Sequence, residues 1–452
     1  MKSINPATGE LIKEYSEMSE GQVKEVVDLN FEAWKGYRET SFAQRSQWMQ
    51  KAAELLRSRR EEYARLITAE MGKRIAESYS EVEKCAWVCE YYAENAEQML
   101  VDELMESDAT KSMAVFNPLG PVLAVMPWNF PFWQVFRFAA PALMAGNAGL
   151  LKHASNVQGC ALAIEEVFRD AGFPENIFRT LVISSSKVEA VIAHPAVKAV
   201  TLTGSEYAGS QVASLAGKYL KKSVLELGGS DPFIVLADAD LEKAAKVAVG
   251  SRMITSGQTC IAAKRFIVEQ HVAAPFLEKV KALMEAYEPG DPGKEETSLA
   301  PLARPDLVDD IDNQVKKSVE QGAQIISGGS RVEGIGNYYS PTILTNVSRG
   351  MPVYMEETFG PVAVVLPVED EKEAIEVAND SLYGLGASLW TSDLKKGEEL
   401  ARKIEAGAVF VNGLVKSDPR LPFGGIKNSG YGRELSGYGI KEFVNIKTVW
   451  IK

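Results

Sequence analysis

From about residue 120 onward, short apolar runs alternate with segments long enough to form a helix. The first runs cover residues 122–126, 148–151, 178–183, 198–203, 223–227 and 233–236. Strands that alternate with helices pair as parallel βαβ units, so this rhythm predicts a doubly wound α/β sheet. A second alternation follows, with runs at 265–268, 324–327, 362–367, 386–390 and 408–411. We therefore expect two α/β domains that meet near residues 227–229.

The two ends of the chain follow other patterns. Near the start, Ser19 and Gln22 form a capping-box pattern before apolar residues at helical spacing, and that spacing recurs in 41–59 and 77–99. At the end, residues 443–451 alternate apolar and polar side chains. This alternation predicts a strand with one buried face, which joins a sheet of its own chain or of a neighbouring copy.

Charge and cysteine content narrow the class of partner. The net charge is −12, whereas a surface that follows nucleic-acid phosphates needs clustered positive charge. No apolar run reaches the roughly 20 residues of a membrane span, and the first residues lack the apolar core of a signal peptide. Four cysteines are too few for a disulfide scaffold, and the three histidines have no metal-ligand spacing. We expect a cytoplasmic protein that acts on a small molecule without a catalytic metal.

Two candidate catalytic residues stand next to glycines. Cys260 ends the segment Ser-Gly-Gln-Thr-Cys (256–260), where a loop can present its thiol, although most single cysteines serve only for packing. Glu226 ends an apolar run directly before Gly228 and Gly229. Burial at a strand end raises the pKa of a carboxyl group and suits a general base, although an ordinary strand-end carboxylate explains an isolated glutamate equally well.

Two further patterns suit an oxyanion and a phosphate. Asn129 lies between Pro127 and Pro131, which restrict the backbone and allow its amide to be held in one orientation as a donor. Gly204 and Ser205 follow the run 198–203 and precede a helix, where a dinucleotide phosphate binds. The glycine spacing here is longer than in the GxGxxG fingerprint, and either pattern alone is also typical of an ordinary turn.

Together these patterns resemble the aldehyde dehydrogenase superfamily, and the resemblance covers nearly the whole chain. It includes segments 5–10 (NPATGE), 356–361 (EETFGP) and 422–430 (PFGGIKNSG). The resemblance implies that Cys260 is the nucleophile, Glu226 the general base and Asn129 the oxyanion donor, alongside the backbone N–H of Cys260. The cofactor contacts that it implies are Pro127, Trp128, Lys152, Ser155, Gly204, Ser205, Gly209, Glu357 and Phe359.

The family resemblance also implies an architecture. We expect an aldehyde dehydrogenase-like α/β fold with a Rossmann-type dinucleotide-binding domain at 1–99 and 119–227. An α/β catalytic domain is expected at 228–435, and a β oligomerisation arm at 100–118 and 436–452. Through this arm the protein is expected to form a homodimer or a homotetramer.

The chemistry that the resemblance implies is oxidation of an aldehyde through a covalent thioester on Cys260. The thiolate attacks the aldehyde carbon, Asn129 stabilises the oxyanion, and a hydride passes to the nicotinamide cofactor. Glu226 then activates the water that hydrolyses the thioester. Formation of the thiolate requires a lowered pKa, which we expect from the positive nicotinamide and from local amides.

The residue at position 155 bears on the choice of cofactor. In many family members that prefer NAD, a glutamate three positions after the cofactor lysine binds the ribose hydroxyls, whereas Ser155 follows Lys152 here. A glutamate would repel the 2′-phosphate of NADP, and a serine hydroxyl can donate to it. We therefore expect NADP as the preferred cofactor, with use of both NADP and NAD as the alternative.

Two residues bear on the choice of aldehyde. Arg137 lies in an apolar helical stretch and requires a carboxylate partner, and Ser417 lies near the substrate-entrance loop of the family. Both resemble the succinate-semialdehyde dehydrogenase branch, in which matching residues hold the distal carboxylate of the substrate. A salt bridge from Arg137 to an internal Asp or Glu is the alternative. A broader aliphatic or glutarate-type semialdehyde dehydrogenase, a cysteine acyl hydrolase and a binding protein are the competing functions.

Overall fold

The computed structural model describes all 452 residues. Its first domain is built on a six-stranded sheet with the order β19-β9-β8-β5-β6-β7. Five of these strands are parallel, and only β19 runs antiparallel to its neighbour β9. The strands are β5 (Pro121–Met126), β6 (Ala148–His153), β7 (Phe178–Thr180), β8 (Ala199–Thr203), β9 (Lys222–Glu226) and β19 (Gly430–Tyr431).

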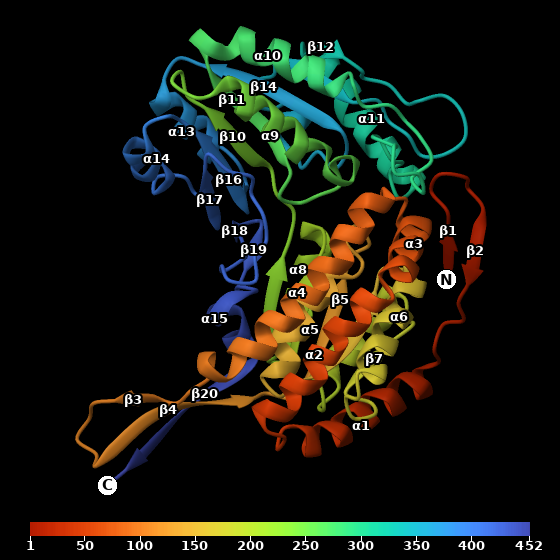
Figure 1. Cartoon of the computed structure of the whole chain (residues 1–452), viewed down its shortest axis with the longest axis vertical. Helices are drawn as coiled ribbons and strands as arrows, with labels where there is room; N and C mark the ends of the chain where they lie inside the picture. Colours follow the sequence, from red (N-terminus) through yellow and green to blue (C-terminus); the bar gives the residue numbers. More distant parts are fainter.

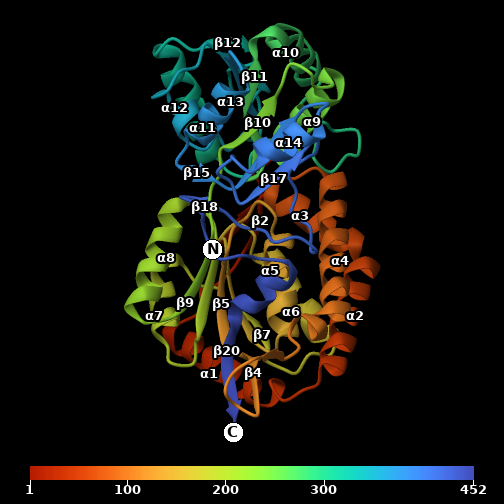
Figure 2. The same cartoon turned by 90° about the vertical axis from the view of Figure 1, so that its left-hand side faces the viewer.

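Helices cover both faces of this first sheet, as Figure 2 shows. The large core on one face contains α2 (Phe42–Ser58), α3 (Arg60–Met71), α4 (Ile75–Met99), α5 (Trp133–Met144) and α6 (Gln158–Asp170). The core on the other face contains α1 (Glu20–Tyr37), α7 (Val188–Ala193) and α8 (Glu206–Lys218). The predicted capping box of Ser19 and Gln22 is present at the start of α1.

The second domain has a seven-stranded sheet with the order β12-β13-β14-β11-β10-β16-β17, and only β12 is antiparallel to its neighbour. One face packs against α9 (Leu241–Met253) and α10 (Gln270–Met284). The other packs against α11 (Pro305–Glu320), α12 (Pro352–Met355), α13 (Glu371–Asn379) and α14 (Leu394–Ala401). The strands are β10 (Asp231–Val235), β11 (Ala263–Glu269), β12 (Gln324–Ser327), β13 (Thr342–Thr345), β14 (Val362–Val368), β16 (Gly386–Trp390) and β17 (Ala408–Val411).

The predicted α/β fold is therefore confirmed. The chain passes between the two sheets from Glu226 to Asp231, close to the expected boundary at residues 227–229. One detail differs from the expectation. After the second domain the chain returns to the first through β19 and α15 (Ser436–Ile440), which contacts α4 and α5. No helix has the length and apolar character that a membrane crossing requires.

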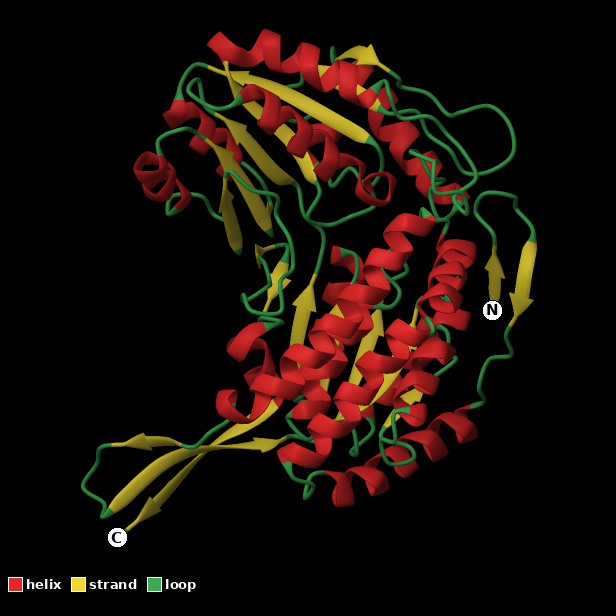
Figure 3. Ribbon diagram, in the orientation of Figure 1, coloured by secondary structure: helices red, strands yellow, loops and turns green.

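A three-stranded arm extends from the first domain (Figures 1 and 3). It consists of β3 (Glu103–Met105), β4 (Lys111–Pro118) and β20 (Val444–Ile451), and β20 pairs with β4 from Val444–Pro118 to Ile451–Lys111. The expected buried face of the last strand is absent in the single chain, because no layer covers the arm. Of β20 only Val444 is buried, while Ile446 and Trp450 are exposed.

Candidate active site

A cavity of about 380 Å³ lies between the two domains. It opens at the carboxyl ends of β5 and β8, where the strand order of the first sheet reverses, and ligands of doubly wound sheets bind at this switch point. The cavity brings together the predicted residues Pro127, Trp128, Asn129, Gly204, Ser205, Cys260, Glu357 and Phe359. Gln134, Thr203, Leu227, Gly228, Arg304, Leu307 and Asp310 complete its lining.

The loop before Cys260 is fixed by unusual backbone geometry. Thr255 and Ser256 are both left-handed, with φ of 53°. Gly257 has a φ of 83°, and a Cβ there would lie 2.1 Å from the carbonyl oxygen of Gly360. The side chain of Gln258 donates to the carbonyl of Thr255 at 2.9 Å and accepts from the N–H of Ala303 at 2.9 Å. A strained loop held by so many contacts presents the thiol in one position.

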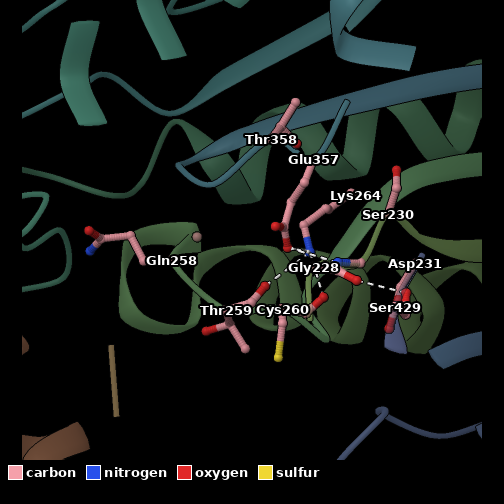
Figure 4. Close-up of polar contacts among 12 residues, drawn as sticks. Gly228, Ser230, Asp231, Gln258, Thr259, Cys260, Lys264, Glu357, Thr358 and Ser429 are labelled. Atoms are coloured by element: carbon pink, nitrogen blue, oxygen red, sulfur yellow. Dashed lines mark hydrogen bonds and ion pairs between the residues drawn. The ribbon is translucent and has the colours of Figure 1, made fainter. Parts of the chain in front are cut away.

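Lys264 holds the Cys260 turn through its backbone carbonyl groups. Its Nζ donates to the carbonyl oxygens of Thr259 at 3.0 Å and Cys260 at 2.6 Å, and it pairs with Glu357 at 3.4 Å. The sulfur of Cys260 points away from this cluster, as Figure 4 shows. The sequence analysis missed Lys264, although a cation inside the apolar run of β11 is a signal that could have found it.

The Cys260 thiol is not activated by the protein alone. Burial raises its pKa to about 12, against the opposing positive charges of Lys264 and Arg137. The expectation that local amides lower this pKa is therefore not met. Among the four cysteines Cys260 is the only one that is partly exposed, because Cys85, Cys89 and Cys160 are buried.

Alkylation of Cys260 by iodoacetamide in cofactor-free protein should consequently be slow near neutral pH. Because only the thiolate reacts, its rate should rise by about tenfold per pH unit as the pH increases towards 10. Mass spectrometry of the alkylated peptide measures this rate. A rate that is already maximal near pH 7 would show that the thiol is ionised in the free protein.

Asn129 is held next to the nucleophile loop. Its Nδ2 donates to the carbonyl of Gln258 at 3.0 Å, and its side chain is buried. An amide nitrogen carries two hydrogens, so one remains for a second acceptor in the cavity that Cys260 also lines. This arrangement is what an oxyanion donor requires.

Glu226 ends β9 behind the cavity rather than in its lining. Both carboxyl oxygens are buried without a hydrogen-bond partner. Burial raises its pKa well above the ordinary value, the negative charge of Glu434 raises it further, and Arg137 and Arg433 oppose the shift. Burial therefore favours the protonated form of Glu226, and only the ionised form can act as a base.

Arg137 forms a buried ion pair with Glu434, a residue that the sequence analysis missed. Its Nη2 also donates to Thr203 Oγ1 at 3.2 Å, and its guanidinium lies 4.7 Å from the centre of the Phe423 ring. The internal salt bridge that was the alternative for Arg137 is thus what the structure shows. Nη1 makes no hydrogen bond within the chain, so a contact between it and a substrate stays a prediction.

Ser417 is buried in the segment after β17 and accepts two hydrogen bonds. The donors are Lys84 Nζ at 2.7 Å and Trp133 Nε1 at 3.1 Å. Nothing in the sequence marks Lys84, which occupies an ordinary position of a helix 333 residues away. The fold alone shows that the two residues meet.

The residues predicted to hold the cofactor form two groups. One group, which includes Ser205 and Phe359, lines the cavity, and the other, Lys152 and Ser155, lies at the carboxyl end of β6. Ser205 is the N-cap of α8, and Phe359 lies edge-on to Trp128 with ring centres 5.7 Å apart. Lys152 is the last residue but one of β6, burial lowers the pKa of its ammonium group, and that group has neither a carboxylate nor a hydrogen-bond partner. Ser155 is exposed in the following turn.

Gly209 does not line the cavity, and its predicted contact with the cofactor stays a prediction. It is buried inside α8, and a Cβ there would lie 2.5 Å from Leu227 Cδ2. The glycine therefore allows α8 to pack closely against the chain that follows β9.

A thiol fixed beside an amide donor, at the ligand-binding edge of a doubly wound sheet, defines an enzyme that acts through a nucleophilic cysteine. A model of the aldehyde dehydrogenase family matches residues 1–449. The chain belongs to the aldehyde dehydrogenase family.

Named relatives match this chain over nearly its whole length and theirs. A probable NADP(+) succinate-semialdehyde dehydrogenase of Synechocystis sp. is 54% identical over 449 residues, which covers 99% of each chain. An NADP(+) succinate-semialdehyde dehydrogenase of Mycobacterium tuberculosis is 48% identical, again with 99% of each chain covered. The crystal structure of a Streptococcus pyogenes succinic semialdehyde dehydrogenase in complex with NADP+ has a TM-score of 0.98 and 39% identity, covering 100% of this chain and 99% of that one.

Proposed function

We propose that this protein oxidises succinate semialdehyde to succinate with NADP as its cofactor. The observation that carries the proposal is the cavity in which Cys260, Asn129 and the turn before α8 meet. The names of the relatives support the substrate and the cofactor. A broader aliphatic or glutarate-type semialdehyde dehydrogenase remains the second candidate, because the same cavity would serve both.

The residues present fit a dinucleotide. The first turn of α8 offers backbone N–H groups for a phosphate, and the ammonium group of Lys152 is free for a hydroxyl or phosphate oxygen. We infer that Ser155 and Glu357 also contact the cofactor, as the resemblance to the family implies. When bound, the nicotinamide of NADP supplies the acceptor for the hydride of the aldehyde.

The chain's own residues perform the remaining steps. Cys260 adds to the aldehyde carbon, and the free N–H of Asn129 with the backbone N–H of Cys260 stabilises the oxyanion by roughly 3–4 kcal/mol per donor. Oxidation leaves a thioester on Cys260. Glu226, once ionised, takes a proton from the water that attacks this thioester, and succinate and the thiol are released.

A panel of aldehydes tests the proposal. Absorbance of the reduced cofactor should show the highest kcat/KM for succinate semialdehyde, with lower values for glutarate semialdehyde and butanal. Equal values for butanal and succinate semialdehyde would favour the broader aldehyde dehydrogenase. Hydrolysis of an activated ester without any oxidation of aldehydes would instead indicate a cysteine acyl hydrolase.

The position of Ser155 leads to a prediction on cofactor choice. Ser155→Glu should raise the KM for NADP by about tenfold or more and leave the KM for NAD nearly unchanged, because the added charge repels only the 2′-phosphate. Initial rates with both cofactors measure the effect. Ser185→Glu, a matched change at an exposed serine after β7, is the control and should alter neither constant. If Ser155→Glu shifts both constants equally, Ser155 is not at the phosphate.

The arm supports a proposal on assembly. We infer a cytoplasmic homodimer or homotetramer in which β3, β4 and β20 of one copy pack on another, because exposed apolar side chains such as Leu104, Ile446 and Trp450 then become covered. We also infer that the domain bounds of the sequence analysis hold, except that β19 and α15 belong to the dinucleotide-binding domain because both pack on it. Light scattering of the purified protein gives the number of copies.

A further inference from the structure

Lys84 carries a charge that nothing in the chain neutralises. It lies on α4, half-buried, with Nζ 2.7 Å from Ser417 Oγ and 4.1 Å from the centre of the Trp133 ring. It forms no ion pair. A partly buried ammonium group without a carboxylate partner is costly, and ionisable groups in such surroundings cluster at functional sites.

The carboxylates around Lys84 are all engaged elsewhere. Glu81 pairs with Lys73 and accepts the backbone N–H groups of Phe132 and Trp133. Glu83 pairs with Arg57 at 2.8 Å, and Asp418 with Arg420 at 2.7 Å. The nearby Arg137, in turn, is neutralised by Glu434. Unlike Lys73, Arg57, Arg420 and Arg137, Lys84 therefore has no carboxylate partner, and its charge is available to a ligand.

Ser417 completes a set of donors. Its oxygen already accepts from Lys84 and Trp133, so its own O–H is left to donate. The ammonium group of Lys84 has three hydrogens, and only one is used by Ser417. Two ammonium hydrogens and one hydroxyl hydrogen thus converge without an acceptor, and a carboxylate supplies the acceptors that they lack.

The Lys84 site is reachable from outside. Lys84 borders an open cavity of about 510 Å³ that it shares with Arg57, Arg60, Tyr79, Ser80, Glu83 and Trp87. On its inner side it contacts Trp133, which follows the oxyanion donor Asn129 by four residues. The charge of Arg137 acts on both the Lys84 ammonium group and the Cys260 thiol, so both groups lie near that side chain.

We propose that Lys84, together with the hydroxyl of Ser417, binds the distal carboxylate of the semialdehyde and so selects for it over uncharged aldehydes. This inference rests on the proposed function and names the residue that confers its specificity. It places the recognising charge on the first domain's helix α4 rather than on the ion-paired Arg137.

The pKa of Lys84 agrees with this role. Burial and, to a smaller extent, the positive charge of Arg137 lower it to about 8, while Cys85, Glu81 and Asp418 oppose the shift. A bound carboxylate stabilises the protonated form and raises the pKa again. Binding of a dicarboxylate product should therefore weaken as the pH rises above about 8, because Lys84 of the free protein then loses its positive charge.

The test is the ratio of kcat/KM for succinate semialdehyde to kcat/KM for butanal. Lys84→Met keeps the length of the side chain and removes its charge, so the ratio should fall by about tenfold or more, mainly through the KM for succinate semialdehyde. Lys84→Arg should restore part of the ratio. Arg60→Met removes one positive charge from the same outer cavity without touching Ser417, and its ratio should stay within about twofold of the wild type.

Inhibition of the wild type by succinate gives a second test that needs no variant. Its inhibition constant should rise with pH above about 8, and this rise should be absent for an uncharged inhibitor such as butanamide. A ratio that Lys84→Met leaves unchanged, or an inhibition constant that is flat from about pH 7 to pH 10, would overturn the role of Lys84. If instead the wild type itself does not prefer succinate semialdehyde, the proposed function fails first.

Discussion

Cys260→Ala should abolish aldehyde oxidation, with kcat reduced by about 10⁴-fold or more, because no other group can form the covalent intermediate. Binding of NADP, measured by titration calorimetry, should stay nearly the same, since the thiol lies on the substrate side of the cavity and Lys264 holds the turn through backbone carbonyls. The burst of reduced cofactor and the steady-state rate should disappear together.

Cys89→Ala is the matched control for this experiment. Cys89 is completely buried in α4 and lines no cavity at the reacting centre, so its loss should cost some stability and leave turnover within about twofold. Hydride transfer that persists in Cys260→Ala would rule out the thioester route. It would leave a direct oxidation of the aldehyde hydrate as the mechanism.

Glu226→Gln should separate the two halves of the reaction. If Glu226 acts on the water that hydrolyses the thioester, the variant should give a rapid burst of about one reduced cofactor per active site, followed by turnover slowed by about 10²-fold or more. Stopped-flow absorbance resolves the two phases. Glu269→Gln, a change at another strand-end carboxylate, is the control and should keep full turnover.

The raised pKa of Glu226 adds a pH dependence to this prediction. The carboxyl group acts as a base only when ionised, and burial and Glu434 hold its pKa above the ordinary value. Turnover of the wild type should therefore increase with pH across that raised pKa, whereas the slow turnover of Glu226→Gln should lack this step. A variant that also loses the burst would show that Glu226 takes the proton of Cys260 as well.

The fold was largely predictable because strands and helices of a doubly wound sheet have their own periodicities. The run 198–203 became β8, and 362–367 became β14. What the sequence does not show is that the chain returns to the first sheet after the second domain, where Gly430 and Tyr431 form β19 beside β9. The last strand was predicted to bury one face, but burial depends on a covering layer that a single chain lacks.

The active site also contains some residues that a local sequence pattern indicates and others that only the fold brings together. Asn129 and Cys260 were predictable because prolines and glycines around them shape a local turn. Glu434 and Lys84 were not, since each is an ordinary charged residue until the fold brings it to Arg137 or Ser417. Pairings between residues hundreds of positions apart leave no trace in a local pattern, and they set the charge of the substrate side.

The return of the chain to the first sheet has a consequence for biosynthesis. Strand β19 and the buried side chains of Leu435, Ile440 and Phe443 complete the core of the first domain, and all of them leave the ribosome last. The second sheet, by contrast, takes all its strands from one continuous stretch between Asp231 and Val411. Contacts between distant segments form slowly. The domain that is synthesised first must therefore wait with an open edge until the second domain has been synthesised.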